Sequence, residues 1–273
     1  MSFELRGVTV RYSPALPRLA LSDVTLSIAQ GEQLALIGPS GAGKTTLLHT
    51  LAFARSIDGG SLRALDAEPW GLSSSGRHAL RARLFLAPQT PPLPPRQRVV
   101  TAVLAGRLPQ WSLLKAITSL FKPADPQAAY DALSRFNLQD KLYARVDRLS
   151  GGERQRCSLA RLLVSNAQAL LVDEPLSALD PALAQQTLDV LRQEARARNA
   201  TLVCSLHQVE LARAHFPRIV GLRNGRVVFD APRDAVSDQM IAALYQQSDR
   251  EAQVSVGEEP EIGAGRGFAS GCY

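Results

Sequence analysis

The chain lacks any long hydrophobic run. Across its 273 residues, no apolar stretch approaches the roughly 20 residues that a membrane-spanning helix needs. The first residues, 1–6, also lack the basic segment followed by an apolar segment that marks a signal peptide. We therefore expect a cytosolic protein whose contact with a membrane is made through a partner.

Cysteine is scarce, and charge is not concentrated. Cys157, Cys204 and Cys272 have neither paired nor metal-type spacing, which predicts reduced thiols. The formal net charge is +6, but no dense basic block occurs, so the sequence does not favour direct binding of nucleic acid. The positive charge is available for phosphates or for an anionic membrane surface.

A glycine-rich loop is present instead. Residues 38–45 fit the phosphate-loop template G-x-x-x-x-G-K-[ST], between a predicted buried strand at 33–37 and a predicted helix at 46–51. A glycine-rich turn before a helix is the alternative, but all four fixed positions and both flanks favour a phosphate site. The residues expected to bind the nucleotide are Gly38, Pro39, Ser40, Gly41, Ala42, Gly43, Lys44, Thr45 and Thr46.

This loop predicts a nucleoside triphosphate. Its glycines let successive N–H groups face the phosphate oxygens, and the following helix N-terminus adds positive potential. Lys44 would reach the β- and γ-phosphates, and the Thr45 hydroxyl would bind Mg²⁺. The loop does not indicate what the energy is used for.

The rest of the pattern predicts an α/β fold. Alternating strands at 3–11 and 24–28, joined by a turn at 12–17, predict an antiparallel β layer. Apolar strands alternating with helices predict a mainly parallel sheet covered on both faces, and Asn224-Gly225 predicts a hairpin. The predicted core strands are 33–37, 84–87, 169–173, 201–205, 219–223 and 226–229.

A helical block interrupts the core. The helices predicted in it are 99–108, 113–121, 126–136 and 151–164. We expect one domain over 1–247, with a core of 1–95 and 165–247 and an inserted helical subdomain of 96–164. Residues 248–273 have little periodicity and are predicted to be a disordered tail.

Two further segments carry chemistry. Asp173 and Glu174 follow an apolar strand, where Asp173 could hold Mg²⁺ and Glu174 could polarise the attacking water. Ser150, with Glu153 three residues later, forms a predicted capping box at the start of a helix. By composition this second motif is either a well-capped helix or a second phosphate site, and composition does not decide between them.

The ordered set of motifs resembles the nucleotide-binding subunit of an ABC transporter over about residues 1–232. The matches are 38–45 (Walker A), 149–152 (signature), 170–173 with Glu174 (Walker B and catalytic glutamate), 177–180 (D-loop), Gln89 (Q-loop), His207 (switch histidine) and Tyr12 (aromatic A-loop). The resemblance implies a P-loop NTPase core of the RecA-like kind, an antiparallel β layer and an inserted helical subdomain.

The resemblance also implies residue roles. Thr45, Gln89 and Asp173 would arrange Mg²⁺ and water, Glu174 would act as general base, and His207 would contact the γ-phosphate. Tyr12 would stack on adenine. Two subunits would form a head-to-tail homodimer around two ATP molecules, with the signature residues of one subunit touching the nucleotide of the other. The residues expected at this contact are Ser150, Gly151, Gly152 and Asp180; Asp180 could be only a helix N-cap before Pro181, and a cap and a dimer contact can coexist.

Several stretches, including 103–108, 206–212 and 216–230, are similar to phosphonate-importer ATPases. With no membrane domain in the chain, the resemblance implies separate permease subunits, an indirect periplasmic binding protein, and a peripheral place on the cytoplasmic face of the inner membrane. Glu153 departs from the glutamine usual in the family, and activity is expected to survive it.

Other functions stay open at this stage. The substrate could be another oxyanion, such as phosphate or phosphite. A soluble ABC ATPase acting on nucleic acid would be expected to carry tandem cassettes, a long coiled coil or zinc motifs, which the sequence lacks. A phosphate-loop kinase would need an acceptor pocket and no signature helix.

Overall fold

The computed structural model describes residues 1–12 and 18–246. The predicted turn at 12–17 falls largely outside the described residues, and the predicted tail at 248–273, with Cys272, lies wholly outside them. Cys157 and Cys204 are both buried and unbridged. Among the described helices, none combines the length and the apolar character needed to cross a bilayer.

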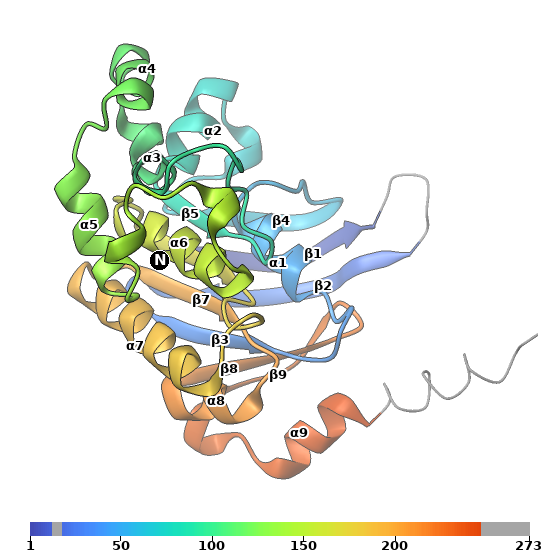
Figure 1. Ribbon diagram of the computed structural model, residues 1–273. Coiled ribbons are helices and arrows are strands. Elements are labelled where there is room, and N and C mark those ends of the chain that lie inside the picture. Colours follow the sequence, from blue (N-terminus) through green and yellow to red (C-terminus); the bar gives the residue numbers. More distant parts are fainter. Residues whose placement is uncertain (13–17, 247–273) are drawn as a thin grey trace, which may run out of the picture.

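A six-stranded sheet forms the centre of the molecule (Figure 1). Its strand order is β5-β6-β7-β3-β8-β9, with β9 antiparallel to β8 and the other neighbours parallel. The strands are β3 (Gln33–Ile37), β5 (Leu84–Ala87), β6 (Ala169–Asp173), β7 (Thr201–Ser205), β8 (Arg218–Arg223) and β9 (Arg226–Pro232). The predicted parallel core and the hairpin at Asn224-Gly225, both with positive φ, are confirmed.

The central strands are buried on both faces, which explains their continuous apolar sequences. In β3, Leu34 and Leu36 belong to one apolar cluster while Ala35 and Ile37 belong to the other. This alternation sends successive side chains to opposite faces of the sheet. The sheet therefore separates two cores and holds the carboxyl ends of its parallel strands along one edge.

One face packs against α1 (Lys44–Leu51) and a second, antiparallel sheet of order β2-β1-β4. This sheet consists of β1 (Phe3–Arg11), β2 (Leu19–Ile28) and β4 (Gly59–Ala64). The antiparallel layer is confirmed, but β2 begins five residues before the predicted position 24. The added residues pair with the end of β1, as Leu19 does with Arg11, so pairing rather than alternation sets the start.

Helices cover the opposite face (Figure 1). They include α6 (Gly151–Leu163), α7 (Pro181–Ala197) and α8 (Val209–His215), while α3 (Val99–Leu104), α4 (Leu113–Phe121) and α5 (Pro126–Ser134) extend the layer between β5 and α6. The two other α-helices are α2 (Ser74–Arg81), whose Leu80 belongs to the core on the α1 side of the sheet, and α9 (Asp238–Tyr245), whose Leu244 belongs to the core under the helical layer.

The predicted helix at 99–108 is shorter than expected. It ends at Leu104 and continues as a 3₁₀ segment over Ala105–Gln110. A Cβ on Gly106 would lie 2.1 Å from the carbonyl oxygen of Arg161, so this glycine allows a close crossing with α6. That packing contact, which the sequence alone does not reveal, accompanies the change of helix type.

Candidate nucleotide-binding site

The phosphate loop between β3 and α1 lines a pocket of about 460 Å³. Four residues from distant parts of the chain reach the same pocket: Tyr12, Gln89, Glu174 and His207. They come from the end of β1 and from segments that follow the carboxyl ends of β5, β6 and β7. The fold thus brings together most of the residues predicted to bind or cleave a nucleotide. The loop residues that line the pocket are Ser40, Gly41, Ala42, Gly43, Lys44, Thr45 and Thr46.

The loop glycines are required by backbone shape. Gly38 and Gly43 have φ angles of 150° and 104°. A Cβ on Gly38 would lie 2.0 Å from the carbonyl oxygen of Leu222, and one on Gly43 would lie 2.8 Å from that of Ala20. The loop is therefore pressed against neighbouring backbone on its inner side. This packing holds the N–H groups of the loop in place.

Lys44 lies at the floor of this cradle. Its ammonium Nζ donates to the carbonyl oxygens of Gly38 at 2.7 Å and Pro39 at 3.1 Å, and the residue is buried. Burial lowers the pKa of Lys44, while the carboxylates of Glu174 and Asp173 act in the opposite direction. A buried cation beside a glycine cradle matches the charge of a polyphosphate.

Asp173 ends β6 and is almost fully buried. Its Oδ1 accepts a hydrogen bond from Ser205 Oγ at 2.6 Å, and the same Ser205 oxygen accepts from the backbone N–H of Glu174 at 2.9 Å. Glu174 has a φ of 46°, an uncommon conformation for a residue with a side chain. Ser205 therefore fixes both carboxylate residues.

Ser205 was missed in the sequence. It is the partner of Asp173 in the pairing of β6 with β7. The available signal was a polar residue ending a buried strand two positions before His207. Because strand order cannot be read from this pattern, the pairing was not predictable.

The Glu174 carboxylate lies between two side chains inside the pocket. Its Oε2 accepts from Gln89 Nε2 at 2.7 Å, and its Oε1 is hydrogen-bonded to His207 Nε2. Gln155 Nε2 on α6 donates to the Glu174 carbonyl at 3.4 Å, a contact that the sequence did not indicate. A carboxylate held this way can accept a proton from a water molecule at the phosphate loop.

The side chains near the loop fit Mg²⁺. Thr45, Asp173 and Gln89 offer a hydroxyl, a carboxylate and an amide oxygen, which are the hard oxygen ligands that Mg²⁺ prefers. The Gln89 nitrogen already donates to Glu174, so the amide oxygen is its remaining acceptor. Within the described part of the chain, no group of three His, Cys, Asp or Glu side chains could hold a metal alone.

The remaining predicted residues lie apart from this pocket. Ser150 caps α6: its Oγ accepts from the Glu153 N–H at 3.2 Å, and the Glu153 carboxylate accepts from the Ser150 N–H at 2.7 Å. Ser150 and Gly151 are exposed. Glu153 also lies 3.8 Å from Lys141 Nζ, so its negative charge is turned toward the cap and a lysine.

The signature helix contacts the segment before α7. A Cβ on Gly152 would lie 2.7 Å from the carbonyl oxygen of Ala178. Asp180 is exposed and caps α7, with its Oδ1 accepting from the Leu183 N–H at 3.0 Å and Pro181 at the first helical position. The exposed Ser150, Gly151 and Asp180, with the half-buried Gly152, thus form a second group that does not line the nucleotide pocket.

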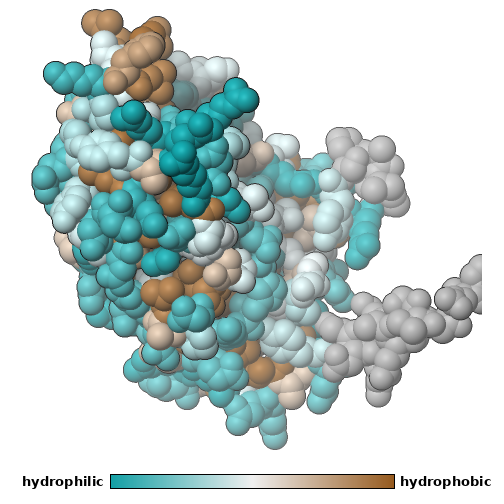
Figure 2. Space-filling view, viewed as in Figure 1, coloured by the Kyte–Doolittle hydropathy of each residue, from teal (hydrophilic) through white to brown (hydrophobic). Residues whose placement is uncertain are grey.

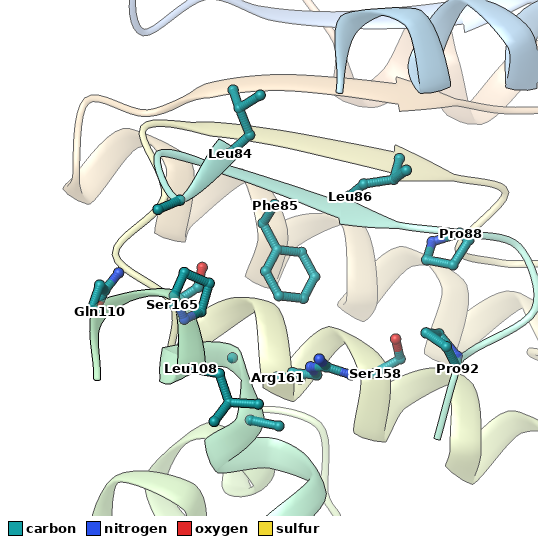
Figure 3. Close-up of a pocket in the computed structure, with 14 residues that line it drawn as sticks. Leu84, Phe85, Leu86, Pro88, Pro92, Leu108, Gln110, Ser158, Arg161 and Ser165 are labelled. Carbon is teal, nitrogen blue, oxygen red and sulfur yellow. The ribbon is translucent and has the colours of Figure 1, made fainter. Parts of the chain in front are cut away.

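A second hollow of about 240 Å³ lies beside the Gln89 segment (Figure 3). Its walls come from β5, the 3₁₀ segment after α3, and α6, and it includes Phe85, Leu108 and Arg161. Burial lowers the pKa of the Arg161 guanidinium. Arg161 Nε is buried without a hydrogen-bond partner among the described residues.

Comparison with known proteins agrees with this geometry. Residues 21–177 match the ABC transporter family. The chain is 57% identical to phosphonates import ATP-binding protein PhnC 2 of Albidiferax ferrireducens, with 90% of each chain covered. It is 50% identical to PhnC 2 of Pseudomonas aeruginosa, with 96% of this chain and 98% of the relative covered.

Solved structures show the same fold. The dimeric cassette MJ0796, a bacterial ABC transporter cassette, superimposes with a TM-score of 0.75 at 24% identity, covering 85% of this chain and 98% of that one. A post-hydrolysis dimer of the same cassette, bound to ADP and Pi, gives a TM-score of 0.72 over the same shares of the two chains. The match over more than half of the chain and the close relatives lead to one conclusion: the chain belongs to the ABC transporter family, as an ATP-binding subunit.

Proposed function

We propose that this chain is the ATP-hydrolysing subunit of an importer for phosphonates. One observation carries the choice of substrate class: relatives at 50–57% identity over about nine-tenths of the chain are phosphonates import ATP-binding proteins. The ATP site itself does not contact the transported substrate, so the substrate class rests on these relatives. Phosphate or phosphite import is the second candidate.

The pocket geometry supports specific roles in hydrolysis. Lys44 and the loop N–H groups bind the β- and γ-phosphates, and Tyr12 stacks on the base at the pocket rim. Thr45, Asp173 and Gln89 would hold Mg²⁺, which would neutralise phosphate charge. Glu174 accepts a proton from the attacking water, and His207, hydrogen-bonded to Glu174 Oε1, contacts the γ-phosphate.

The exposed group at α6 supports a composite site. Ser150 and Gly151 present a helix N-terminus to solvent, outside the nucleotide pocket of their own chain. In a head-to-tail homodimer, this end of one subunit closes over the phosphates held by the other, and Asp180 lies near the contact. Two ATP molecules then bind at one interface.

The hollow beside Gln89 is a suitable docking place for the permease. It is lined by Phe85 and Leu108 and contains Arg161, whose buried Nε has no acceptor among the described residues. A permease segment with an apolar side chain and a carbonyl or carboxylate oxygen would satisfy it. Because Pro88 and Pro92 line the same hollow, movement there reaches the segment that carries Gln89. The subunit would then sit on the cytoplasmic side of the inner membrane, with a periplasmic binding protein acting indirectly.

Growth on defined phosphorus sources tests the proposal. We expect deletion of this chain from its host to abolish growth on a phosphonate as sole phosphorus source, while growth on phosphate is retained. Wild-type chain should restore growth, and Glu174→Gln should not.

The controls separate the alternatives. Loss of growth on phosphite with normal growth on phosphonate would mean that the importer carries phosphite and not phosphonates. Normal growth on both, combined with an ATPase rate stimulated by DNA or RNA, would replace transport with a nucleic-acid function.

A further inference from the structure

The helix α4 is apolar on its exposed side. Five large side chains are exposed on it: Leu113 (77%), Leu114 (73%), Ile117 (47%), Leu120 (59%) and Phe121 (88%). Their spacing of i, i+1, i+4, i+7 and i+8 places them on one face of the helix. Figure 2 shows a hydrophobic patch at the projecting end of the molecule, over α4.

The side of α4 that faces the protein is small and polar. Ser119 is the buried residue of the helix, and its Oγ accepts from the Ala124 N–H at 3.2 Å. The usual arrangement of a surface helix, with large apolar side chains inward, is reversed. Such a surface requires an occupant, because exposing this much apolar area to water is unfavourable.

The charge of the sequence interval that contains α4 indicates the occupant, although Arg107 within it is paired with Asp125. Between Glu68 and Asp125 the sequence contains no acidic residue, although the whole chain has 25. Eight basic residues occur in this interval: Arg77, Arg81, Arg83, Arg96, Arg98, Arg107, Lys115 and Lys122. Lys115 and Lys122 lie on or directly after α4, and the Lys115 ammonium lies 5.3 Å from the centre of the Trp111 ring.

We propose that α4 binds directly to the surface of an anionic lipid bilayer. Leucine, isoleucine and phenylalanine on one face, with Lys115 and Lys122 on the other side of the helix and Trp111 just before it, fit a helix that lies in the membrane interface. The lysine side chains can place their ammonium groups among lipid phosphates while the apolar face enters the acyl boundary. This contact adds to the partner-mediated one expected from the sequence.

A lipid surface fits α4 better than a permease segment does. The hollow lined by Leu108 and Gln110 is concave and suits a protein segment, whereas α4 begins three residues beyond it and projects outward. The hollow and the α4 surface are continuous along the chain. Membrane contact by α4 would therefore orient the subunit with the hollow toward the permease.

Vesicle binding by the purified full chain, without ATP or permease, tests this inference. We expect co-sedimentation with phosphatidylcholine vesicles containing phosphatidylglycerol, and much less with phosphatidylcholine alone. The double substitution Leu114→Glu/Phe121→Glu should weaken binding about ten-fold or more, because both side chains lose apolar burial and gain negative charge. Lys115→Gln and Lys122→Gln should each weaken it about five-fold.

Matched variants elsewhere serve as controls. Tyr143→Glu/Val228→Glu changes two other exposed apolar residues (61% and 40%) and should bind vesicles as wild type does. Lys141→Gln should do so too. All α4 variants should hydrolyse ATP at the wild-type rate, so a failure here is distinct from a failure of the proposed function.

Three results would overturn the inference. The first is equal binding of wild-type chain to neutral and anionic vesicles, or of the α4 double variant and wild type to anionic ones. The second is loss of co-purification with the permease in lipid-free detergent by the α4 double variant, because the permease would then cover the helix. The third is lipid-free self-association of wild type that the same variant abolishes, because a second copy would then be the occupant.

Discussion

Two helix N-termini of this chain carry glycines and offer backbone N–H groups, but their surroundings differ. The start of α1 has no side-chain cap: Gly43 precedes it, and the loop and Lys44 form the wall of a pocket. The start of α6 has a complete capping box from Ser150 and Glu153 and faces solvent. The first can receive phosphate within one chain, whereas the second lies outside that pocket. Under the head-to-tail dimer proposed above, the second would complete the nucleotide site of another copy.

The largest expected effect is in the nucleotide pocket beside the start of α1. Glu174→Gln removes the carboxylate that accepts the proton while the amide can still hydrogen-bond Gln89 and His207. We expect hydrolysis to fall about 10²–10⁴-fold, with ATP still bound and a stable dimer formed. Turnover and light scattering with ATP measure both; near wild-type turnover would remove Glu174 from this role. Glu210→Gln on α8 is the control and should leave both unchanged.

Ser150→Arg tests the role of the exposed N-terminus of α6. A large side chain there should keep this helix end from the phosphates of the one site that it completes, and we expect hydrolysis to fall about a hundred-fold or more, with ATP binding by the monomer unchanged. Ser237→Arg makes the same exchange at the N-cap of α9, where Ser237 Oγ accepts from the Met240 N–H. It should remove a similar N-cap hydrogen bond but leave the rate of ATP hydrolysis unchanged. Persistent hydrolysis by Ser150→Arg would contradict the assignment of α6.

Ser205→Ala tests whether Ser205 positions Asp173 and Glu174 in the nucleotide pocket. The change removes the donor to Asp173 Oδ1, which is buried, and the acceptor of the Glu174 N–H, which is half-buried. We expect kcat to fall about ten-fold with little change in KM, and the free energy of unfolding to fall by about 1–3 kcal/mol. Ser165→Ala, which loses one buried bond to the Leu162 carbonyl, should lower stability only. An equal fall in kcat for both variants would leave Ser205 with a structural role alone.

Glu153→Gln should have the smallest effect. A glutamine oxygen can still accept from the Ser150 N–H, so the capping box is retained and only the charge near Lys141 is lost. We expect urea denaturation to shift by less than about 1 kcal/mol and the ATPase rate to change less than about two-fold. A large rise in rate would mean that the Glu153 charge opposes phosphate at the α6 end.

The sequence predicted most of the fold because its signals are local. The buried runs of β3, β5, β6 and β7 were placed at their observed bounds, since nothing competes with a continuous apolar strand. Element ends set by tertiary contact were less accurate: β2 is extended by its pairing with β1, and α3 shortens near the close crossing at Gly106.

The candidate site follows the same rule as the fold: residues within local motifs were predicted, and residues placed by tertiary contact were not. Residues carried by motifs, such as Lys44 and Glu174, were found, and the structure gathers them at one pocket. Ser205 and Gln155 were not found, because their roles arise from the neighbouring positions of β6, β7 and α6 in space. The sequence predicted α4 as a helix. It did not show that the apolar face points outward, because that depends on which side of the helix packs against the protein.

A mixing experiment tests the composite site most directly. Glu174→Gln and Ser150→Arg chains, each inactive alone, are combined in equal amounts before ATP is added. In a head-to-tail heterodimer one of the two sites joins an intact Glu174 with an intact Ser150, so the mixture should exceed the summed rates of the two variants and reach at most about a quarter of the wild-type rate, because Glu174→Gln chains also pair with themselves. A rate no higher than the sum of the two separate variants would show that each ATP is cleaved within a single chain.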